Sequence, residues 1–494
     1  MKKLFILLIL LSAVDFIYPQ NQFQQFIFHV NSITDPGLKA SAVDSFMIYA
    51  RTQGIPFITG DSANFMYRGS VSSISVAGDF NSWSADSSMI NINQTNFWFY
   101  SKRFELDARL DYKFVTNGSN WILDPENPNM VSGGFGPNSE LAMPEYIQPW
   151  EINYNSSISH GTLLNKIIFS SYLNANYQLK IYLPLGYDSL SLERYPTVYF
   201  QDGFEYVSLA SAPNVIDNLI DSNKIKSVIA VFVRPNNRND EYAGNKRLQY
   251  RNFFINELVP YIDQNCKTKV LASDRLVLGD SYGGNISAII SYNHPDLFGN
   301  CGLHSGAFQP NGYEIYSQIM TDLANGITKN IKWYSTWGTY EGSLTGTMNS
   351  FKDSLLIHNY EMGWMEKHEG HSWGLWRATI DDILVYFFPY YPTAVNDEVH
   401  NIPQQFELKQ NYPNPFNPST KISWQSPIGS WQTLKVYDIL GNEIVTLVNE
   451  YRNAGSYEVD FNIPLTNYHL SSGVYFYRLQ IGSLERTKKM LLLK

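Results

Sequence analysis

Cysteine is scarce in this chain of 494 residues, which contains only Cys266 and Cys301. Two thiols cannot form a framework of several disulfides or a site in which four cysteines bind a metal. Cys266 precedes the strand that leads to Ser281, and Cys301 begins an apolar run after the next helix. Neighbouring strand starts would bring the two close together. The sequence therefore leaves two alternatives, a disulfide between Cys266 and Cys301 or two free buried thiols.

Long apolar runs and an excess of basic residues are also missing. No segment reaches the roughly 18 consecutive apolar residues that a membrane-spanning helix needs, so we expect no transmembrane anchor in the mature chain. Lysine and arginine number 36 against 45 acidic residues, which gives a net charge of −9. A chain of this charge has no electrostatic surface for nucleic acid, and we expect no nucleic-acid partner.

The first residues have the pattern of a secretory signal peptide. Met1-Lys2-Lys3 is basic, the run from Leu4 to Leu11 is apolar throughout, and Ser12-Ala13 follows. A basic start, a short apolar run and small residues are typical of a segment that is removed on export. We predict a signal peptide over residues 1–20 and an exported mature protein.

The patterning of the remaining chain predicts several domains. A helical lead-in is expected over residues 21–60, where Pro36 and Gly54 lie at the ends of a helical stretch. Short alternating runs separated by turn residues predict a small β-sandwich over 61–148. Strands of the buried type alternate with helical stretches over 150–392, which predicts a mostly parallel sheet with helices on both faces.

The end of the chain returns to the all-β pattern. Residues 393–405 are polar and contain prolines, which favours a linker. Residues 406–494 hold short alternating runs with turns at Leu440-Gly441-Asn442 and Ser472-Gly473, so a second small all-β sandwich is expected there.

The strongest chemical motif is Gly279-Asp280-Ser281-Tyr282-Gly283, which follows an apolar strand and precedes a helical stretch. A serine on such a sharp turn exposes its hydroxyl at the edge of a sheet, and the small residues on either side relieve the crowding. Ser281 is therefore the candidate nucleophile. The alternative is a structural turn, because G-x-S-x-G also occurs by chance.

A serine nucleophile needs a base and an acid, which should follow it in the order acid, then histidine. His371, in Gly370-His371-Ser372-Trp373, lies between a predicted strand and the final helix and is the candidate base. His368 is its competitor. Glu341 follows the strand Ile331 to Trp337 and is the candidate acid. Its competitors, Asp353 and Glu366, have the pattern of solvated surface charges.

The oxyanion of the reaction needs donors, which we expect from backbone amides. Tyr282 follows the nucleophile, and Gly203 and Phe204 follow the strand Thr197 to Phe200. A metal site is not indicated, because Gly370 interrupts the pair His368 and His371 and no third ligand stands out. We therefore expect neither a metal nor a cofactor.

The predicted α/β segment resembles the esterase family that includes enterochelin esterases, esterase D and the feruloyl and acetyl-xylan esterases of carbohydrate esterase family one. The resemblance rests on words that occur in order: FQDG from Phe200, RNDEY from Arg238, GDSYGG from Gly279, PDLFG from Pro295, GTYE from Gly338 and GHSW from Gly370. It implies an α/β-hydrolase fold and a triad of Ser281, His371 and Glu341. Many members of the family have aspartate at the position of Glu341.

The predicted sandwich over 61–148 resembles the early-set, glycogen-binding type of carbohydrate-binding module. The matching words are GDFNSW from Gly78, YKF from Tyr112 and GSNW from Gly118. The resemblance implies that Trp83, Lys113 and Trp121 stack on a sugar and donate hydrogen bonds to it. The alternative is a module that only packs against the catalytic domain.

The last segment resembles the type IX secretion sorting domain of Bacteroidetes-like bacteria. The matching words are NYPNPFNP from Asn411, VYD from Val436 and LSSGVYFYR from Leu470. The resemblance implies export across the outer membrane after the inner one, and the secretion machinery as a partner. Secretion or display at the cell surface is therefore expected.

Taken together, these patterns predict a secreted serine carboxylesterase that works through an acyl-enzyme. Export favours a polymeric substrate that is too large to import, so feruloyl or acetyl groups on plant polysaccharide such as xylan are expected. One alternative is a siderophore trilactone esterase of the enterochelin type. An alternative of another class is a non-catalytic glycan-binding or adhesive surface protein.

Overall fold

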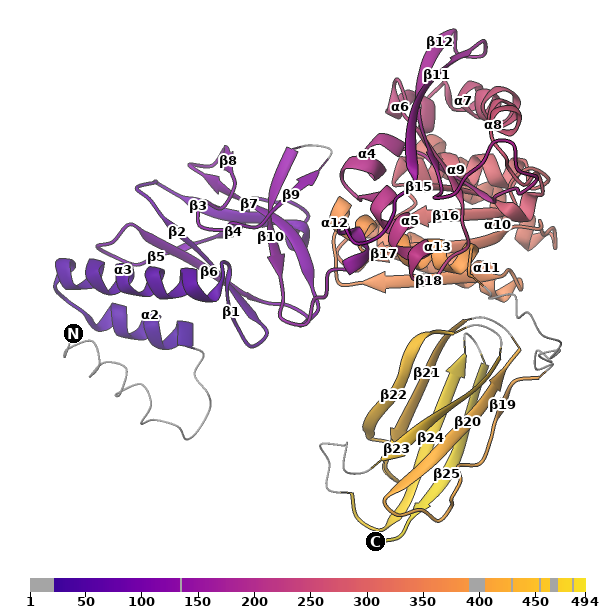
Figure 1. The fold of residues 1–494 in the computed structure, drawn as a ribbon. Helices are drawn as coiled ribbons and strands as arrows, with labels where there is room; N and C mark the ends of the chain where they lie inside the picture. Colours follow the sequence, from indigo (N-terminus) through magenta and orange to yellow (C-terminus); the bar gives the residue numbers. More distant parts are fainter. Residues whose placement is uncertain are drawn as a thin grey trace. The chain divides into compact units, whose positions relative to one another are not determined.

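The computed structural model describes residues 22–133, 136–390, 405–427, 430–452, 455–462, 470–481 and 484–494 (Figure 1). The chain forms two compact units, which divide between Tyr391 and Pro392. The signal peptide predicted over 1–20 and all but the last residue of the predicted linker lie outside the described residues. None of the helices described is both long enough and apolar enough to cross a membrane.

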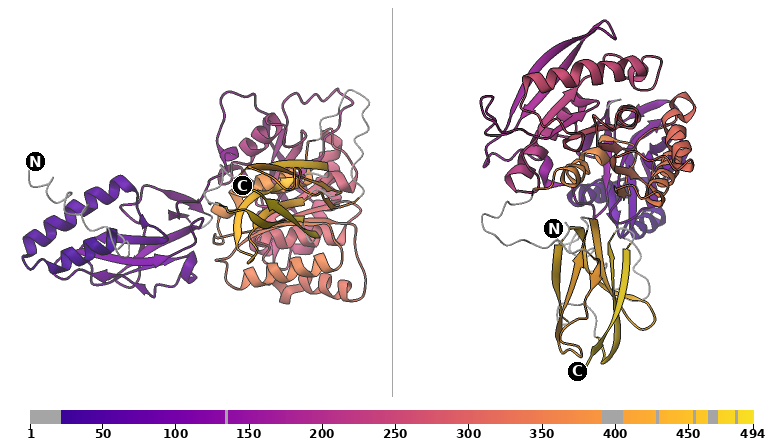
Figure 2. Two further views of the ribbon diagram at one scale, coloured as in Figure 1. Left: turned by 90° about the horizontal axis from the view of Figure 1, so that it is seen from below. Right: turned by 90° about the vertical axis from the view of Figure 1, so that its right-hand side faces the viewer.

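Two helices open the first unit, α2 (Gln22–Ser32) and α3 (Pro36–Gln53). Asp35 caps α3, because its carboxylate accepts a hydrogen bond of 2.8 Å from the amide of Leu38. The apolar faces of both helices pack on the sheet that follows, around Phe57 and Phe97. Figure 2 shows them as the indigo pair on one side of the strands.

The next strands form the N-terminal sandwich (residues 57–142), which has two antiparallel sheets. Their orders are β1-β2-β6-β5 and β4-β3-β7-β10-β9, with β8 paired to β7. Phe65 of the first sheet meets Tyr112 of the second edge to face, at a centroid distance of 4.8 Å. The strands are β1 (Phe57–Thr59), β2 (Ser62–Arg68), β3 (Ile74–Gly78), β4 (Ser87–Ser88), β5 (Ile90–Asn91), β6 (Phe97–Arg103), β7 (Arg109–Thr116), β8 (Asn120–Ile122), β9 (Met130–Gly133) and β10 (Gly136–Ala142).

The second part of this unit is the α/β segment (residues 162–387), built on an eight-stranded sheet. The order is β11-β12-β14-β13-β15-β16-β17-β18. β12 is antiparallel to both of its neighbours, whereas β14 to β18 are parallel. The strands are β11 (Thr162–Ser170), β12 (Ala175–Leu183), β13 (Thr197–Phe200), β14 (Ile229–Val233), β15 (Arg275–Asp280), β16 (Asn300–His304), β17 (Lys332–Gly338) and β18 (Met362–Lys367).

Helices cover both faces of this sheet, because successive residues of a buried strand point to opposite sides. Cys301 and Leu303 of β16 lie in the core that contains Ile286 of α9, while Gly302 between them faces Ile383 of α13. The helices are α4 (Gly203–Ser208), α5 (Ala212–Asp221), α6 (Arg238–Tyr242), α7 (Arg247–Phe253), a π-helical segment (Phe254–Leu258), α8 (Val259–Asn265), α9 (Tyr282–Asn293), α10 (Pro310–Ala324), α11 (Ser343–Ile357), α12 (Trp373–Arg377) and α13 (Ile380–Phe387).

The second unit also contains two antiparallel sheets around one core. Their orders are β19-β20-β23 and β22-β21-β24-β25, and Trp424 and Tyr477 lie in the core between them. The strands are β19 (Glu407–Leu408), β20 (Ser419–Ser426), β21 (Ser430–Tyr437), β22 (Glu443–Arg452), β23 (Gly455–Asn462), β24 (Gly473–Ile481) and β25 (Leu484–Leu492).

The two cysteines are free thiols. Cys266 follows the end of α8, and β15 begins only at Arg275. Cys301 is buried in β16, where its neighbour in β15 is Val277. Of the two alternatives that the sequence left open, the structure therefore has the unpaired one, because Cys266 does not lie at the start of a strand beside Cys301.

Candidate active site

Ser281 occupies the sharp turn between β15 and α9, with φ 52° and ψ −117°. This conformation is strained for a residue with a side chain and is typical of functional sites. Both glycines of the motif are closely packed, and the backbone leaves no room for a side chain at Gly279. A Cβ atom on Gly279 would lie 2.3 Å from the carbonyl oxygen of Gly283, and one on Gly283 would lie 3.0 Å from Oδ2 of Asp202. The turn thus exposes the hydroxyl at the carboxyl end of the strand.

His371 and Glu341 complete a chain of hydrogen bonds that starts at Ser281. The Nε2 atom of His371 lies 2.9 Å from the Ser281 Oγ atom, and its Nδ1 atom lies 2.9 Å from Oε1 of Glu341. The Glu341 side chain is fully buried, whereas that of His371 is 37% exposed. Glu341 is held from behind, because its Oε2 accepts a hydrogen bond of 3.1 Å from the Gly338 amide. A hydroxyl, a base and a carboxylate in this order can activate the hydroxyl for attack.

The competing residues have other partners. His368 lies 2.7 Å from Asp107 of the N-terminal sandwich. The carboxylate of Glu366 accepts a hydrogen bond of 2.6 Å from the Trp337 indole, and Asp353 is exposed beside Lys352. None of these contacts leads to Ser281.

His304, which is fully buried, has a structural role. Its Nδ1 atom lies 2.6 Å from the Tyr206 hydroxyl. Burial lowers the pKa of its imidazole to about 3, so the ring is neutral. Its backbone carbonyl accepts a hydrogen bond of 2.8 Å from the Ser281 amide, which helps to fix the turn.

The predicted oxyanion donors lie at the starts of two helices. Tyr282 is the first residue of α9, and Gly203 and Phe204 are the first two residues of α4. Amides in the first turn of a helix have no partner within the helix. The two preceding strands, β15 and β13, are neighbours in the sheet, with Leu278 opposite Phe200. The three amides therefore belong to adjacent strand ends.

A buried cluster of charges lies behind this edge. The Nε atom of Arg238 donates to both oxygens of Asp202, at 2.8 and 2.9 Å, and Nη2 donates to the carbonyl oxygen of Asp280 at 3.2 Å. The two carboxyl groups are also hydrogen-bonded to one another. Burial and the charge of Asp202 raise the pKa of Asp280 well above its usual range. The closeness of the two carboxyl groups therefore disfavours a second negative charge beside that of Asp202.

Trp83, Lys113 and Trp121 of the N-terminal sandwich line one cavity of about 350 Å³. The indole rings of the two tryptophans are stacked, with centroids 6.4 Å apart. The same cavity is lined by Asp79, Asp111, Asn138, His371 and Ser372. The cavity thus joins the residues predicted to bind a sugar with the histidine that contacts Ser281.

Several residues of this cavity were not predicted from the sequence. Asp111 precedes Lys113 by two positions in β7, and this spacing places both side chains on one face of the strand. This two-residue spacing from Lys113 could have identified Asp111 from the sequence. Asn138 lies in β10 and reaches the site through Asp111, to whose carboxylate it donates a hydrogen bond of 2.9 Å. Its place depends on strand pairing, for which the local sequence has no signal.

The described residues contain no group of three or more His, Cys, Asp or Glu side chains that could hold a metal ion. His368 and His371, the pair considered from the sequence, contact Asp107 and Glu341 as separate couples.

Two parts of the chain match known families. Residues 170–354 match the family described as "Putative esterase". Residues 410–493 match the family described as secretion system C-terminal sorting domain. The central segment is therefore similar in sequence to esterases, and the end of the chain is similar to the C-terminal sorting domains of a secretion system.

The chain is also similar to individual proteins. An uncharacterized protein of Bacillus subtilis, YjcH, is 27% identical over 242 residues, which are 46% of this chain and 97% of that protein. A protein of Xylanibacter ruminicola named endo-1,4-beta-xylanase/feruloyl esterase is 27% identical over 225 residues, which are 43% of this chain. The matched region spans only 31% of the length of that second protein.

Among solved structures, the enterobactin esterase of Shigella flexneri, determined in the presence of enterobactin, has a TM-score of 0.56 to this chain. The alignment covers 66% of this chain and 92% of the other, at 18% sequence identity. At this identity the similarity establishes the α/β-hydrolase fold and not the substrate.

Proposed function

We propose that this protein is a serine carboxylesterase in which Ser281 is the nucleophile, His371 the general base and Glu341 the acid that orients it. The observation that supports the proposal is the unbroken chain of two hydrogen bonds, each 2.9 Å long, from Ser281 through His371 to Glu341. A strained serine conformation and an esterase family match over residues 170–354 agree with it.

The proposed reaction has two steps that pass through an acyl-enzyme. Ser281 Oγ attacks the carbonyl carbon of the ester while its proton moves to Nε2 of His371. Glu341 accepts a hydrogen bond from Nδ1 and stabilises the imidazolium that forms. The amides of Tyr282 and of Gly203 or Phe204 stabilise the oxyanion. The intermediate collapses as His371 returns the proton to the leaving alcohol, and water then repeats the sequence to release the acid.

For the substrate, we propose feruloyl or acetyl esters on a plant polysaccharide such as xylan. The support is the shared cavity, in which two stacked indole rings and Lys113 lie beside His371. Indole rings stack on the apolar face of a pyranose, and an ammonium group donates hydrogen bonds to its hydroxyls. A sugar that carries the ester would thus be held next to the reacting serine. The Xylanibacter relative is named as a feruloyl esterase, which agrees with this choice.

Export of the protein is part of the same proposal. The sorting domain over 410–493 implies secretion, and we propose a signal peptide over 1–20 followed by type IX transport across the outer membrane. A polysaccharide is too large to import, so an exported esterase suits a polymeric substrate.

The proposal is tested with the variant Ser281→Ala. We expect the wild-type protein to hydrolyse p-nitrophenyl acetate and the variant to lose this activity, while its circular dichroism spectrum stays unchanged. A fluorophosphonate probe should label the wild type and not the variant. Retained activity in the variant would exclude Ser281, and a wild type that binds polysaccharide but reacts with neither ester nor probe would favour a non-catalytic adhesive protein.

A substrate panel separates the two esterase alternatives. It contains feruloylated xylan, acetylated xylan and a trilactone siderophore of the enterobactin type. We expect hydrolysis of at least one xylan ester, with kcat/KM well above that of the trilactone. The opposite order would favour the siderophore esterase, with which this chain shares its fold.

A further inference from the structure

Of the three residues of the proposed triad, His371 has the least support from the central sheet. It belongs to the histidine loop (residues 368–372), which connects the end of β18 at Lys367 to the start of α12 at Trp373. Ser281 is held between a strand and a long helix, and Glu341 by the amide of Gly338. The histidine loop needs another support if His371 is to contact both.

Arg109, the first residue of β7 in the N-terminal sandwich, contacts this loop on both sides of His371. Its backbone amide donates a hydrogen bond of 3.0 Å to the carbonyl oxygen of His368. Its Nη1 atom donates one of 3.2 Å to the Ser372 hydroxyl. Ser372 in turn accepts a hydrogen bond of 3.3 Å from the Gly374 amide at the start of α12.

Gly370 of the histidine loop and Gly374 of α12 let this part of the chain approach the sandwich closely. A Cβ atom on Gly370 would lie 2.0 Å from the carboxyl carbon of Asp79. A Cβ atom on Gly374 would lie 1.8 Å from Nη1 of Arg109. Both positions therefore exclude any side chain while the sandwich stays in place, and the loop backbone rests directly on Asp79 and Arg109.

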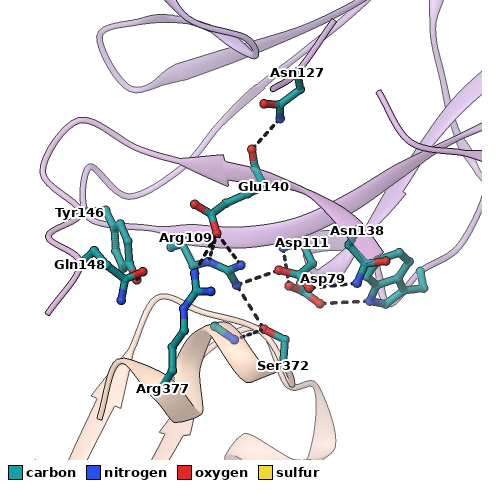
Figure 3. A network of polar contacts seen from close by, with 12 residues as sticks. Asp79, Arg109, Asp111, Asn127, Asn138, Glu140, Tyr146, Gln148, Ser372 and Arg377 are labelled. Atoms are coloured by element: carbon teal, nitrogen blue, oxygen red, sulfur yellow. Dashed lines mark hydrogen bonds and ion pairs between the residues drawn. The ribbon is translucent and has the colours of Figure 1, made fainter. Parts of the chain in front are cut away.

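The Arg109 guanidinium is itself held rigidly. Its side chain is fully buried, with Nη1 2.7 Å from Asp111 and with Nε and Nη2 3.0 and 2.8 Å from one oxygen of Glu140 (Figure 3). Glu140 also accepts a hydrogen bond of 3.2 Å from Arg377 at the end of α12. Carboxylates thus fix the guanidinium plane, as a planar group with several donors allows.

We propose that Arg109 is a positioning residue for His371, and that the N-terminal sandwich is thereby a working part of the esterase site. Arg109 holds residues 368 and 372, so that the imidazole between them lies within hydrogen-bond distance of both Ser281 and Glu341. The inference rests on the proposed function, because it concerns the same His371.

The expected signature is a loss of kcat. Proton transfer through His371 depends on its exact distance from Ser281, and a misplacement of about 1 Å costs on the order of 100-fold in rate. A small ester such as p-nitrophenyl acetate lacks the sugar that the sandwich residues are proposed to hold, so its KM should change by less than about twofold. An unfolded fraction would instead lower the number of active sites.

The experiment compares three variants of the full chain, Arg109→Met, Arg109→Lys and Arg103→Met. Arg103 lies in the same sandwich, is exposed and pairs with Asp61, so its variant is the matched control. We expect kcat for p-nitrophenyl acetate to fall at least tenfold in Arg109→Met and to stay at the wild-type value in Arg103→Met. In Arg109→Lys the charge remains but the planar set of donors is lost, so the protein should fold and kcat should still fall.

Titration with a fluorophosphonate separates positioning from folding. In the Arg109 variants we expect every site to be labelled at completion, at a slower rate than in the wild type. A titre that falls in proportion to kcat would show a folding role and overturn the proposal, as would wild-type kcat in Arg109→Met.

A further variant changes the residue of α12 that faces Arg109. Gly374→Ala adds a methyl group where Arg109 lies, so it should lower kcat in the same way without removing a charge. If the wild type is active, Ser281→Ala is inactive and the Arg109 and Gly374 variants keep full kcat, the positioning role fails while the esterase remains. If the wild type hydrolyses no ester, the proposed function fails and this inference fails with it.

Discussion

At the scale of single residues, Glu341 and Glu366 differ in which neighbours their carboxylates meet. Glu341 lies beyond the end of β17 and faces His371, whereas Glu366 lies within β18 and accepts hydrogen bonds from Trp337 and Asn349. The first contact belongs to the proposed site and the second to the packing of the strand. This difference makes the two glutamates a matched pair for mutation.

We expect Glu341→Gln to lower kcat by on the order of 10³-fold or more, because the amide cannot stabilise the imidazolium and favours the wrong tautomer of His371. Glu366→Gln should keep kcat within about threefold. Steady-state hydrolysis of p-nitrophenyl acetate measures both. Equal effects of the two substitutions would exclude Glu341 as the acid.

Replacement of Arg238 should lower both the stability of the protein and kcat. The side chains of Asp202 and Asp280 are nearly fully buried, and Arg238 is the cation that contacts both. Arg238→Leu leaves them without it, so we expect the free energy of unfolding to fall by roughly 2–4 kcal/mol. We also expect kcat to fall, because Asp202 and Asp280 directly precede the proposed oxyanion donor Gly203 and the nucleophile.

Urea unfolding and steady-state kinetics measure the two effects. Arg247→Leu is the control, because Arg247 pairs with the partly exposed Glu314 instead. Unchanged stability in Arg238→Leu would show that this cation does not stabilise the two buried carboxyl groups.

At the scale of elements, the histidine loop carries a buried carboxyl that should make stability depend on pH. Glu369 is 1% exposed, and its carboxylate oxygens have no hydrogen-bond partner among the described residues. Burial raises the pKa of its carboxyl to about 7, although Arg109, Lys367 and Arg377 act against this rise. The ordinary value is 4.5, so between these pH values the folded state binds the proton and the unfolded state does not.

Because the folded state binds this proton more tightly, stability falls as the pH rises. The contribution of Glu369 to stability is complete below about pH 4.5 and is lost as the pH rises through about 7. Over this window the free energy of unfolding should fall by an amount on the order of 3 kcal/mol. Thermal unfolding between pH 5 and 8 measures it.

The matching variant is Glu369→Gln, which removes the titration. Its melting temperature should fall less between pH 5 and 8 than that of the wild type. Glu361→Gln is the control, because Glu361 is exposed beside Lys332. A variant whose melting curve keeps the slope of the wild type would assign the pH dependence to other buried carboxyl groups.

At the scale of the whole molecule, the N-terminal sandwich and the α/β segment share one cavity. We expect Trp121→Ala to raise KM for a feruloylated xylo-oligosaccharide about tenfold, because an exposed indole that stacks on a sugar contributes on the order of 1–1.5 kcal/mol. KM for p-nitrophenyl acetate should not change. Trp150→Ala is the control, since Trp150 has a similar exposed fraction, 48% against 46%, and contacts Lys224 instead.

If KM for the oligosaccharide stays unchanged in Trp121→Ala, the sandwich does not bind the sugar that carries the ester. Polysaccharide binding by the catalytically inactive variant Ser281→Ala would then show whether the two tryptophans bind a separate glycan.

Much of the fold was predictable because its signals are local. Buried strands such as β13 and β14 are short apolar runs, and α3 begins at Pro36 after Asp35 and ends just before Gly54. The first two strands of the central sheet, β11 and β12, were not predicted. In β11 the apolar residues stand in adjacent pairs and are mostly exposed, so the strand pattern is weak there. In β12 the buried residues Tyr177, Leu179 and Ile181 do alternate with polar ones, and this available signal was missed.

What the sequence by itself determined is the turn at Ser281. Gly279, two residues before it, is required because its backbone packs directly on that of Gly283, and local sterics make the motif recognisable. The order of the acid and the histidine after the serine, and the motifs that resemble the esterase family, could also be read directly from the sequence. The contact between Arg109 and Ser372 is different, because 263 positions separate the two residues. Only the packing of the sandwich against the histidine loop decided that contact, since a hydrogen bond between distant segments leaves no periodic pattern in either one.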